Sequence, residues 1–311
     1  MGLKVLSLFD GISCGMVALE RAGIQVDRYV AYEIDKYAIQ VSQKNYPQIE
    51  HCGDVTTADF TQYEGFDLLI GGSPCQSLSI TRGEIRTNLN GKSKLFFEFV
   101  RALNEVKPKY FLFENVASMN KESKQVISEL LGCEPVLIDS RLFSAQQRAR
   151  YYWTNIPFTE LPQESNTVLR DVMQLEEEIP EKMYYSAPVR DINMQKQVCA
   201  YLHVNVNEMH KRVFNPDCKI HTLTCVSGGY QHKKVLVNNR CRRLTPLEYE
   251  RLQTLPDNYT DCVSDSRRYT AIGNGWTVDV IAHILKGLCV CEGIANTKIN
   301  ASELIISSLT A

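Results

Sequence analysis

Short apolar runs alternate with segments of helical periodicity through the first half of the chain. The runs are rich in residues that favour strands, and residues 95–106 repeat apolar side chains at the spacing of a helix. This alternation builds units of strand, helix and parallel strand, so the sequence predicts an α/β fold with a mainly parallel, doubly wound sheet. The expected strands are residues 4–9, 29–32, 67–70, 110–113, 136–138 and 151–154.

The pattern changes after Pro157, where prolines, a run of glutamates and the pair Gly228-Gly229 interrupt the alternation. Residues 245–248 then form a predicted capping box with proline at the first helical position, which indicates a helix to about residue 255. The amphipathic run 278–288 is expected to pack back on the first domain. The predicted organisation is a large domain of residues 1–157 completed by 241–292, a smaller domain 158–240 and a tail 293–311.

Composition and charge narrow the class of protein. Of 311 residues, 44% are hydrophobic and 23% are charged, as in ordinary globular proteins. A net charge of −2 argues against nonspecific coating of nucleic acid, so any contact with DNA must be local. The 11 cysteines are odd in number and irregularly spaced, which favours reduced thiols over disulfides or a metal site. No apolar run suits a membrane span and no secretory signal is recognised, so we expect an intracellular, cytoplasmic protein.

Acidic residues follow the expected strands, where ligands bind in open parallel sheets. Glu33 lies about twenty residues beyond the Phe9-Asp10-Gly11 turn, the spacing at which an acid accepts hydrogen bonds from a cofactor ribose. The turn lacks the second glycine that lets a backbone approach a pyrophosphate, so a nucleoside without phosphates fits better than NAD. Alone, these features would equally suit an ordinary glycine turn followed by a solvated acid.

A thiol, an acid and two arginines form a second set of candidates. Cys75 follows an expected strand, Glu114 follows the next, and alternation along an entering strand would put Arg148 and Arg150 on one face. Carbon 5 of cytosine is too poor in electrons to attack a methyl sulfonium unaided. A thiolate that adds at carbon 6 enriches carbon 5, and an acid at N3 with an arginine at O2 would stabilise the resulting charge.

These elements resemble the DNA (cytosine-5) methyltransferase family. The motifs Pro74-Cys75-Gln76, Glu114-Asn115-Val116 and Gln146-x-Arg148-x-Arg150 occur in that family's order and approximate spacing. Later in the chain, Arg243-Leu244-Thr245-Pro246 and Gly273-Asn274-Gly275-Trp276 extend the resemblance, which covers nearly everything except the smaller domain and the tail. Several details resemble the catalytic domains of eukaryotic de novo DNA methyltransferases, whereas the short N-terminus resembles compact bacterial or phage enzymes.

The resemblance implies a Rossmann-like S-adenosylmethionine-dependent methyltransferase fold in which residues 158–240 form a target-recognition domain. It also implies methylation of a cytosine flipped out of double-stranded DNA, without a metal and with the oligomeric state left open. Ser13 and Cys14 depart from the usual glycines of the first turn, and Ser73 from a phenylalanine common in bacterial members.

The implied catalytic residues are Cys75, Glu114, Arg148 and Arg150. The implied cofactor residues are Phe9, Asp10, Gly11, Ile12, Ser13, Cys14, Glu33, Ile34, Asp54, Val55, Ser73, Pro74, Leu95, Asn274, Gly275 and Trp276. The candidate DNA contacts are Gln76, Ser79, Arg82, Thr222, Thr224, Gly228, Gly229 and Arg240.

Three alternatives stay open at this point. A branch of the same family methylates cytosine in transfer RNA, but it carries a Cys-Phe-Thr element where this chain has Thr222-Leu223-Thr224-Cys225. A catalytically silent DNA-binding homologue is the second alternative, against which the intact Cys75, Glu114 and Arg150 count. An NAD-dependent oxidoreductase is the third, disfavoured by the missing glycines.

Overall fold

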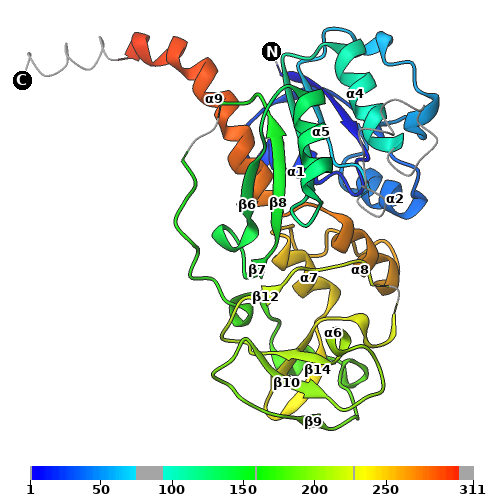
Figure 1. The fold of residues 1–311 in the computed structure, drawn as a ribbon, viewed down its shortest axis with the longest axis vertical. Helices are drawn as coiled ribbons and strands as arrows, with labels where there is room; N and C mark the ends of the chain where they lie inside the picture. Colours follow the sequence, from blue (N-terminus) through cyan, green and yellow to red (C-terminus); the bar gives the residue numbers. More distant parts are fainter. Residues whose placement is uncertain (1, 75–93, 158–159, 227, 301–311) are drawn as a thin grey trace, which may run out of the picture.

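The larger part of the molecule is built on a seven-stranded sheet (Figure 1). The computed structural model describes residues 2–74, 94–157, 160–226 and 228–300. The strand order is β3-β2-β1-β4-β5-β8-β6, and β3, β2, β1, β4 and β5 are parallel. Their bounds are β1 Leu3–Leu8, β2 Val26–Tyr32, β3 Glu50–His51, β4 Leu68–Gly71, β5 Tyr110–Val116, β6 Val136–Asp139 and β8 Ala149–Thr154. The mainly parallel sheet and all six predicted strands are confirmed, with ends displaced by a few residues.

Helices cover both faces of this sheet, because alternate residues of each buried strand supply two separate apolar cores. Leu112 of β5 packs with residues of α1 and α9, whereas its neighbour Phe113 packs with α4 and α5. The helices of this part are α1 Cys14–Arg21, α2 Lys36–Asn45, α4 Lys94–Val106, α5 Lys121–Leu131 and α9 Val278–Asn300. The expected return of the final amphipathic run to the first domain is therefore confirmed. The helix continues to Asn300, beyond the point at which we placed the start of the tail.

The direction of β8 determines what lies at the edge where β4 and β5 end. β8 runs antiparallel to both β5 and β6, so its first residues meet the last residues of β5. Arg150 is opposite Val116, and Tyr152 is opposite Glu114. The topology thus places Arg150 beside Glu114 at the carboxyl edge of the parallel strands.

A second body carries a five-stranded sheet of order β14-β13-β11-β10-β9 (Figure 1). Its strands are β9 Val189–Arg190, β10 Val198–Leu202, β11 Arg212–Phe214, β13 Lys234–Val237 and β14 Arg240–Arg243. The short strands β7 Gln146–Gln147 and β12 Ile220–His221 pair with each other and join the two bodies. The remaining helices are α6 Glu208–Lys211, α7 Pro246–Leu252 and α8 Asp265–Asn274.

α7 and α8 are bound to the second body as well as to the first. Tyr249 and Ile272 share an apolar cluster with Phe214 and Val235 of the second sheet. The fully buried Arg242 of β14 donates to Glu248 of α7 at 2.9 and 2.8 Å, and Glu248 also completes the predicted capping box with Thr245. The proposed boundary at residue 240 therefore falls at the start of β14, within an interaction network that continues into α7.

Candidate active site

The turn after β1 is held by a buried carboxylate. Phe9, Gly11 and Ser13 all take positive φ angles, of 58°, 60° and 59°. The carboxylate of Asp10 accepts hydrogen bonds from Ser7 Oγ at 2.6 Å, from Tyr29 Oη at 2.7 Å and from Ser13 Oγ. Burial raises the pKa of the Asp10 carboxyl, and the three hydroxyl donors oppose that rise. Asp10 therefore stabilises the turn through these three hydrogen bonds, and its contact with the cofactor stays a prediction.

Ser13 shows how this chain manages without the usual glycine. An L-residue in the left-handed region is strained, and glycine avoids that cost. The Ser13 hydroxyl bonds to Asp10 and, at 2.6 Å, to Ser42 Oγ of α2, so side-chain hydrogen bonds offset the strain. Ile12, Ser13 and Cys14 are all buried, and burial raises the pKa of the Cys14 thiol to about 12. The side chains of these three residues therefore stabilise the turn by packing and hydrogen bonding in its interior.

The half-buried Glu33 and the exposed Ile34 directly follow β2 at this edge. Glu33 Oε2 accepts the backbone N–H of Gly11 at 2.8 Å, and Oε1 accepts those of Ile34 and Asp35, each at 2.8 Å. Ile34 leaves 74% of its surface in solvent, an unusual exposure for a large apolar side chain. A carboxylate beside an uncovered apolar side chain fits a ribose with its attached base.

Asp54, Val55, Leu95, Ser73 and Pro74, which were also expected to bind the cofactor, differ in burial and in their contacts. Asp54 Oδ1 accepts from the backbone N–H of Thr56 at 2.8 Å and from its hydroxyl at 2.9 Å. Val55 is buried, and Leu95 packs against the same apolar core. Ser73 is buried and Pro74 is exposed.

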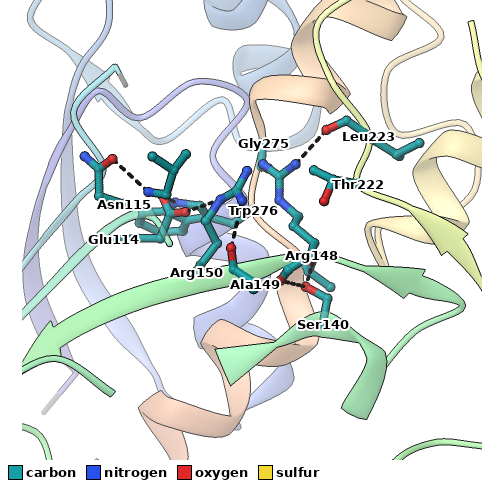
Figure 2. Close-up of polar contacts among 12 residues, drawn as sticks. Glu114, Asn115, Ser140, Arg148, Ala149, Arg150, Thr222, Leu223, Gly275 and Trp276 are labelled. Atoms are coloured by element: carbon teal, nitrogen blue, oxygen red, sulfur yellow. Dashed lines mark hydrogen bonds and ion pairs between the residues drawn. The ribbon is translucent and has the colours of Figure 1, made fainter. Parts of the chain in front are cut away.

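Glu114, Arg150 and Trp276 meet at the carboxyl edge of the sheet (Figure 2). Arg150 Nε lies 2.9 Å from Glu114 Oε1, and these two side chains are 14% and 12% exposed. Trp276 Nε1 donates to Glu114 Oε2 at 3.1 Å. The acid and the arginine that we had paired from sequence are thus in direct contact, in a setting with little solvent.

Asn115 connects β5 to the loop that follows β4. Its Nδ2 donates to the carbonyl of Ser73 at 3.2 Å and to the Ser73 hydroxyl at 3.4 Å. Ser73 precedes Cys75 by two residues in the sequence. Cys75 lies outside the described residues, as do Gln76, Ser79 and Arg82, so their predicted roles rest on the sequence alone.

Arg148 is directed at backbone carbonyls. Its guanidinium donates to Leu223 O at 2.8 Å, to Gly275 O at 3.1 Å and to Gly273 O at 3.3 Å, and the residue is 5% exposed. Burial lowers the pKa of this guanidinium to about 10, so Arg148 stays charged at neutral pH. These contacts join the two bodies (Figure 2), which favours a framework role. A catalytic role for Arg148 stays a prediction that these contacts do not support.

The candidate recognition residues lie along the segment after β12. Thr222 Oγ1 donates to Gln147 O at 2.8 Å, whereas the side chain of Thr224 is exposed. Gly228 and Gly229 both take positive φ angles. Arg240 is engaged within the second body, where it pairs with Glu181 and stacks over Tyr184 with its Cζ 3.9 Å from the ring centroid. A phosphate would therefore compete with Glu181 for Arg240.

Two buried glutamines were absent from the predicted site. Gln146 Nε2 donates to Gln253 Oε1 at 3.0 Å, and Gln146 Oε1 accepts the N–H of Leu223 at 2.8 Å. Gln253 Nε2 in turn donates to Gly275 O at 3.0 Å, so the pair reinforces the contacts of Arg148. Gln146 belongs to the motif Gln146-x-Arg148-x-Arg150, and that membership was the signal that could have assigned it to the site.

Neither a metal centre nor a membrane-spanning helix is found in the part of the chain that the structure describes. No group of three or more histidine, cysteine, aspartate or glutamate side chains there could hold a metal ion. Among the same residues, no helix combines the length and apolar character of a membrane span.

Comparisons with known proteins agree on one family. Residues 3–289 match the family described as C-5 cytosine-specific DNA methylase. The type II methyltransferase M.HhaI of Haemophilus parahaemolyticus is 26% identical, with 91% of this chain and 93% of that protein aligned. M.NlaX of Neisseria lactamica, also a type II methyltransferase, is 28% identical over 90% of this chain and 94% of its own. Among solved structures, the Entamoeba histolytica methyltransferase EhMeth has the same fold, with a TM-score of 0.71 at 18% identity over 93% of this chain and 98% of its own. The chain belongs to the C-5 cytosine-specific DNA methylase family.

Proposed function

We propose that Cys75, Glu114 and Arg150 carry out the cytosine-5 methylation that defines this family, on a base flipped out of duplex DNA. Family membership establishes a DNA cytosine-5 methyltransferase that uses S-adenosylmethionine. The residue roles and the duplex substrate are our proposal. The observation that carries it is the ion pair between Glu114 Oε1 and Arg150 Nε, which are 2.9 Å apart at the carboxyl edge of the sheet. At the same edge Asn115 contacts Ser73, which precedes Cys75 by two residues in the sequence.

In the proposed chemistry, the chain's own residues activate the ring. The Cys75 thiolate forms a bond to carbon 6, and the electrons of the 5,6 double bond become available at carbon 5. Glu114 in its protonated form donates to N3 and accepts from the exocyclic amine, while Arg150 approaches O2, so both stabilise the charge that develops on the ring. After the methyl group is in place, a base such as water takes the carbon 5 proton, the electrons of that bond re-form the 5,6 double bond, and the bond between carbon 6 and the sulfur breaks to release the thiolate. When bound, S-adenosylmethionine supplies the electrophilic methyl group.

The proposed cofactor site uses the edge formed by β1, β2 and the segment after β3. Glu33 would accept the ribose hydroxyls, Asp54 the adenine amine, and Ile34 and Phe9 would cover the faces of the base. The exposure of Ile34 supports this assignment, because a bound adenine would remove its apolar surface from water. Asp10, Ser13 and Cys14 would hold the turn in shape.

Replacing Glu33 by alanine should weaken S-adenosylmethionine binding by roughly 10- to 100-fold, because charge-assisted hydrogen bonds are lost. Calorimetric titration of the full chain measures this dissociation constant. Asp35→Asn is the matched control: it removes the neighbouring charge yet keeps an acceptor for the Tyr37 N–H at the start of α2. An unchanged affinity in Glu33→Ala would refute the ribose assignment.

The proposed DNA contacts lie in two segments. The sequence after Cys75 contains Gln76, Ser79 and Arg82, which we propose approach the phosphates and the gap left by the flipped base. Thr222, Thr224, Gly228 and Gly229 form the proposed loop that reads base edges in the major groove. The exposed side chain of Thr224 supports this assignment. The type II methyltransferases among the relatives support a place in restriction–modification.

Transfer of a tritiated methyl group tests the substrate. We expect label in duplex DNA, at cytosine carbon 5 as shown by bisulfite sequencing, and no label in transfer RNA offered in the same reaction. Label confined to transfer RNA would overturn the duplex DNA proposal in favour of the RNA-modifying alternative. No label in either, from a protein that binds S-adenosylmethionine and DNA, would instead indicate a silent homologue.

A further inference from the structure

We infer that Trp276 is a positioning residue for Glu114, and that its indole N–H fixes the orientation in which the carboxyl group meets the base. The contact is direct, with Trp276 Nε1 3.1 Å from Glu114 Oε2. This inference rests on the proposed role of Glu114. It goes beyond the expectation that Trp276 only lines the cofactor pocket.

Each oxygen of the Glu114 carboxyl group has its own polar partner. Arg150 Nε forms an ion pair with Oε1 at 2.9 Å, and the indole N–H of Trp276 donates to Oε2. Rotation about the last side-chain bond of a glutamate is soft when the carboxyl group is unrestrained. An ion pair on one oxygen and a hydrogen bond on the other together restrict rotation of the carboxyl group. The group then keeps one orientation toward the space where the base would lie.

The indole is itself held on several sides, so it can act as a rigid support. A Cβ added to Gly15 would lie 3.6 Å from Trp276 Cζ3, and one added to Gly72 would lie 3.2 Å from Nε1. The ring therefore sits between the start of α1 and the loop after β4. At Gly275, an added Cβ would be 3.2 Å from Cys14 Sγ, so a larger residue would disturb the backbone that precedes Trp276. Side chains that position a catalytic group act well only when they are themselves fixed in this way.

The backbone before Trp276 is also bound to the recognition segment. Arg148 joins Gly273 O and Gly275 O to Leu223 O. Gly273 packs so closely on this segment that an added Cβ would lie 2.5 Å from Thr224 O. The segment proposed to read DNA and the residue that orients Glu114 are consequently fixed to each other.

Trp276→Phe tests the inference, because it keeps an aromatic ring and deletes the N–H. We expect kcat at saturating donor and DNA to fall by roughly 10- to 100-fold, as for other small misplacements of catalytic groups. The dissociation constant for S-adenosylmethionine should stay within about threefold. Trp153→Phe is the matched control, since it deletes the chain's other indole N–H, which bonds to Ser128 Oγ in the opposite core, and should leave kcat within about twofold.

A double-mutant cycle separates this inference from the proposed function. In a Glu114→Ala background, measured by single-turnover transfer with enzyme in excess, adding Trp276→Phe should change the rate by less than about twofold. An equal effect of Trp276→Phe with and without Glu114 would overturn positioning. A fully active Glu114→Ala would overturn the proposed function itself. If only cofactor affinity falls in Trp276→Phe, with kcat unchanged, Trp276 is a wall of the cofactor pocket and the inference fails.

Nuclear magnetic resonance gives a readout that does not depend on activity. The chain has two tryptophans, so the variants Trp153→Phe and Trp276→Phe assign both indole N–H signals directly. The Trp276 proton should move upfield and exchange faster with solvent in Glu114→Ala, because its acceptor is gone. The same signal unchanged in Glu114→Ala would contradict the hydrogen bond and the inference with it.

Discussion

Replacing Cys75 by alanine should abolish methyl transfer, by on the order of 10⁴-fold or more, while the affinity for S-adenosylmethionine stays within about twofold. Without the sulfur, carbon 6 receives no nucleophile, so carbon 5 keeps too little electron density to attack the methyl group. Glu114 and Arg150 cannot compensate, since they stabilise charge that the thiolate addition creates. Tritium transfer to duplex DNA and calorimetric titration of the cofactor measure the two quantities separately.

Cys289→Ala is the control for Cys75→Ala. Cys289 is an exposed thiol on α9 whose Sγ lies 3.7 Å from Ala22 O, and the variant should transfer methyl groups at the normal rate. Loss of activity in both variants would point to general thiol sensitivity. Normal turnover by Cys75→Ala would refute covalent catalysis through this residue.

Replacing Arg148 by methionine should destabilise the folded chain by about 3–5 kcal/mol, because three backbone carbonyls lose a buried donor at a cost of about 1–3 kcal/mol each. Methionine fills much of the space but has no donor. The carbonyls of Leu223, Gly273 and Gly275 would then lose the guanidinium that all three contact in a site shielded from water. Urea unfolding monitored by circular dichroism measures the change as a lower midpoint.

Arg141→Met provides the comparison for Arg148→Met. Arg141 lies in the same connection between β6 and β8, but its side chain is 45% exposed and its ion pair with Asp139 spans 3.1 Å. Surface pairs of this kind contribute about 0–1 kcal/mol, so the variant should unfold at nearly the normal midpoint. A midpoint for Arg148→Met equal to that of Arg141→Met would show that the buried contacts contribute nothing to stability.

The contact between Glu114 and Arg150 depends on the antiparallel direction of β8, which local pattern did not predict. Local pattern was sufficient to predict the strands and the order of the motifs. These features follow from residues close together in sequence or from the rule that parallel strands end at one edge. The position of Glu33 and Ile34 at that edge was predictable in the same way, because both directly follow a strand.

Other features depended on contacts between distant parts of the chain. The carboxylate of Asp10 accepts hydrogen bonds from three hydroxyls, and one of them belongs to Tyr29 on the next strand, which local pattern does not predict. Arg148 and Arg150 are two residues apart, and only the approach of Leu223 and Gly275 separates their environments. The indole N–H of Trp276 reaches Glu114 across 162 positions of sequence, which no local pattern encodes.

The link between the two bodies has a consequence for how such a protein can change its target. Arg148 donates to a backbone carbonyl oxygen of Leu223, and every amino acid has such an oxygen. Leu223 could therefore be replaced by another residue without loss of this hydrogen bond. Given the proposed role of this segment in reading DNA, neighbouring side chains are then free to diversify in response to new DNA sequences, while the backbone contacts that align them with the catalytic residues are kept.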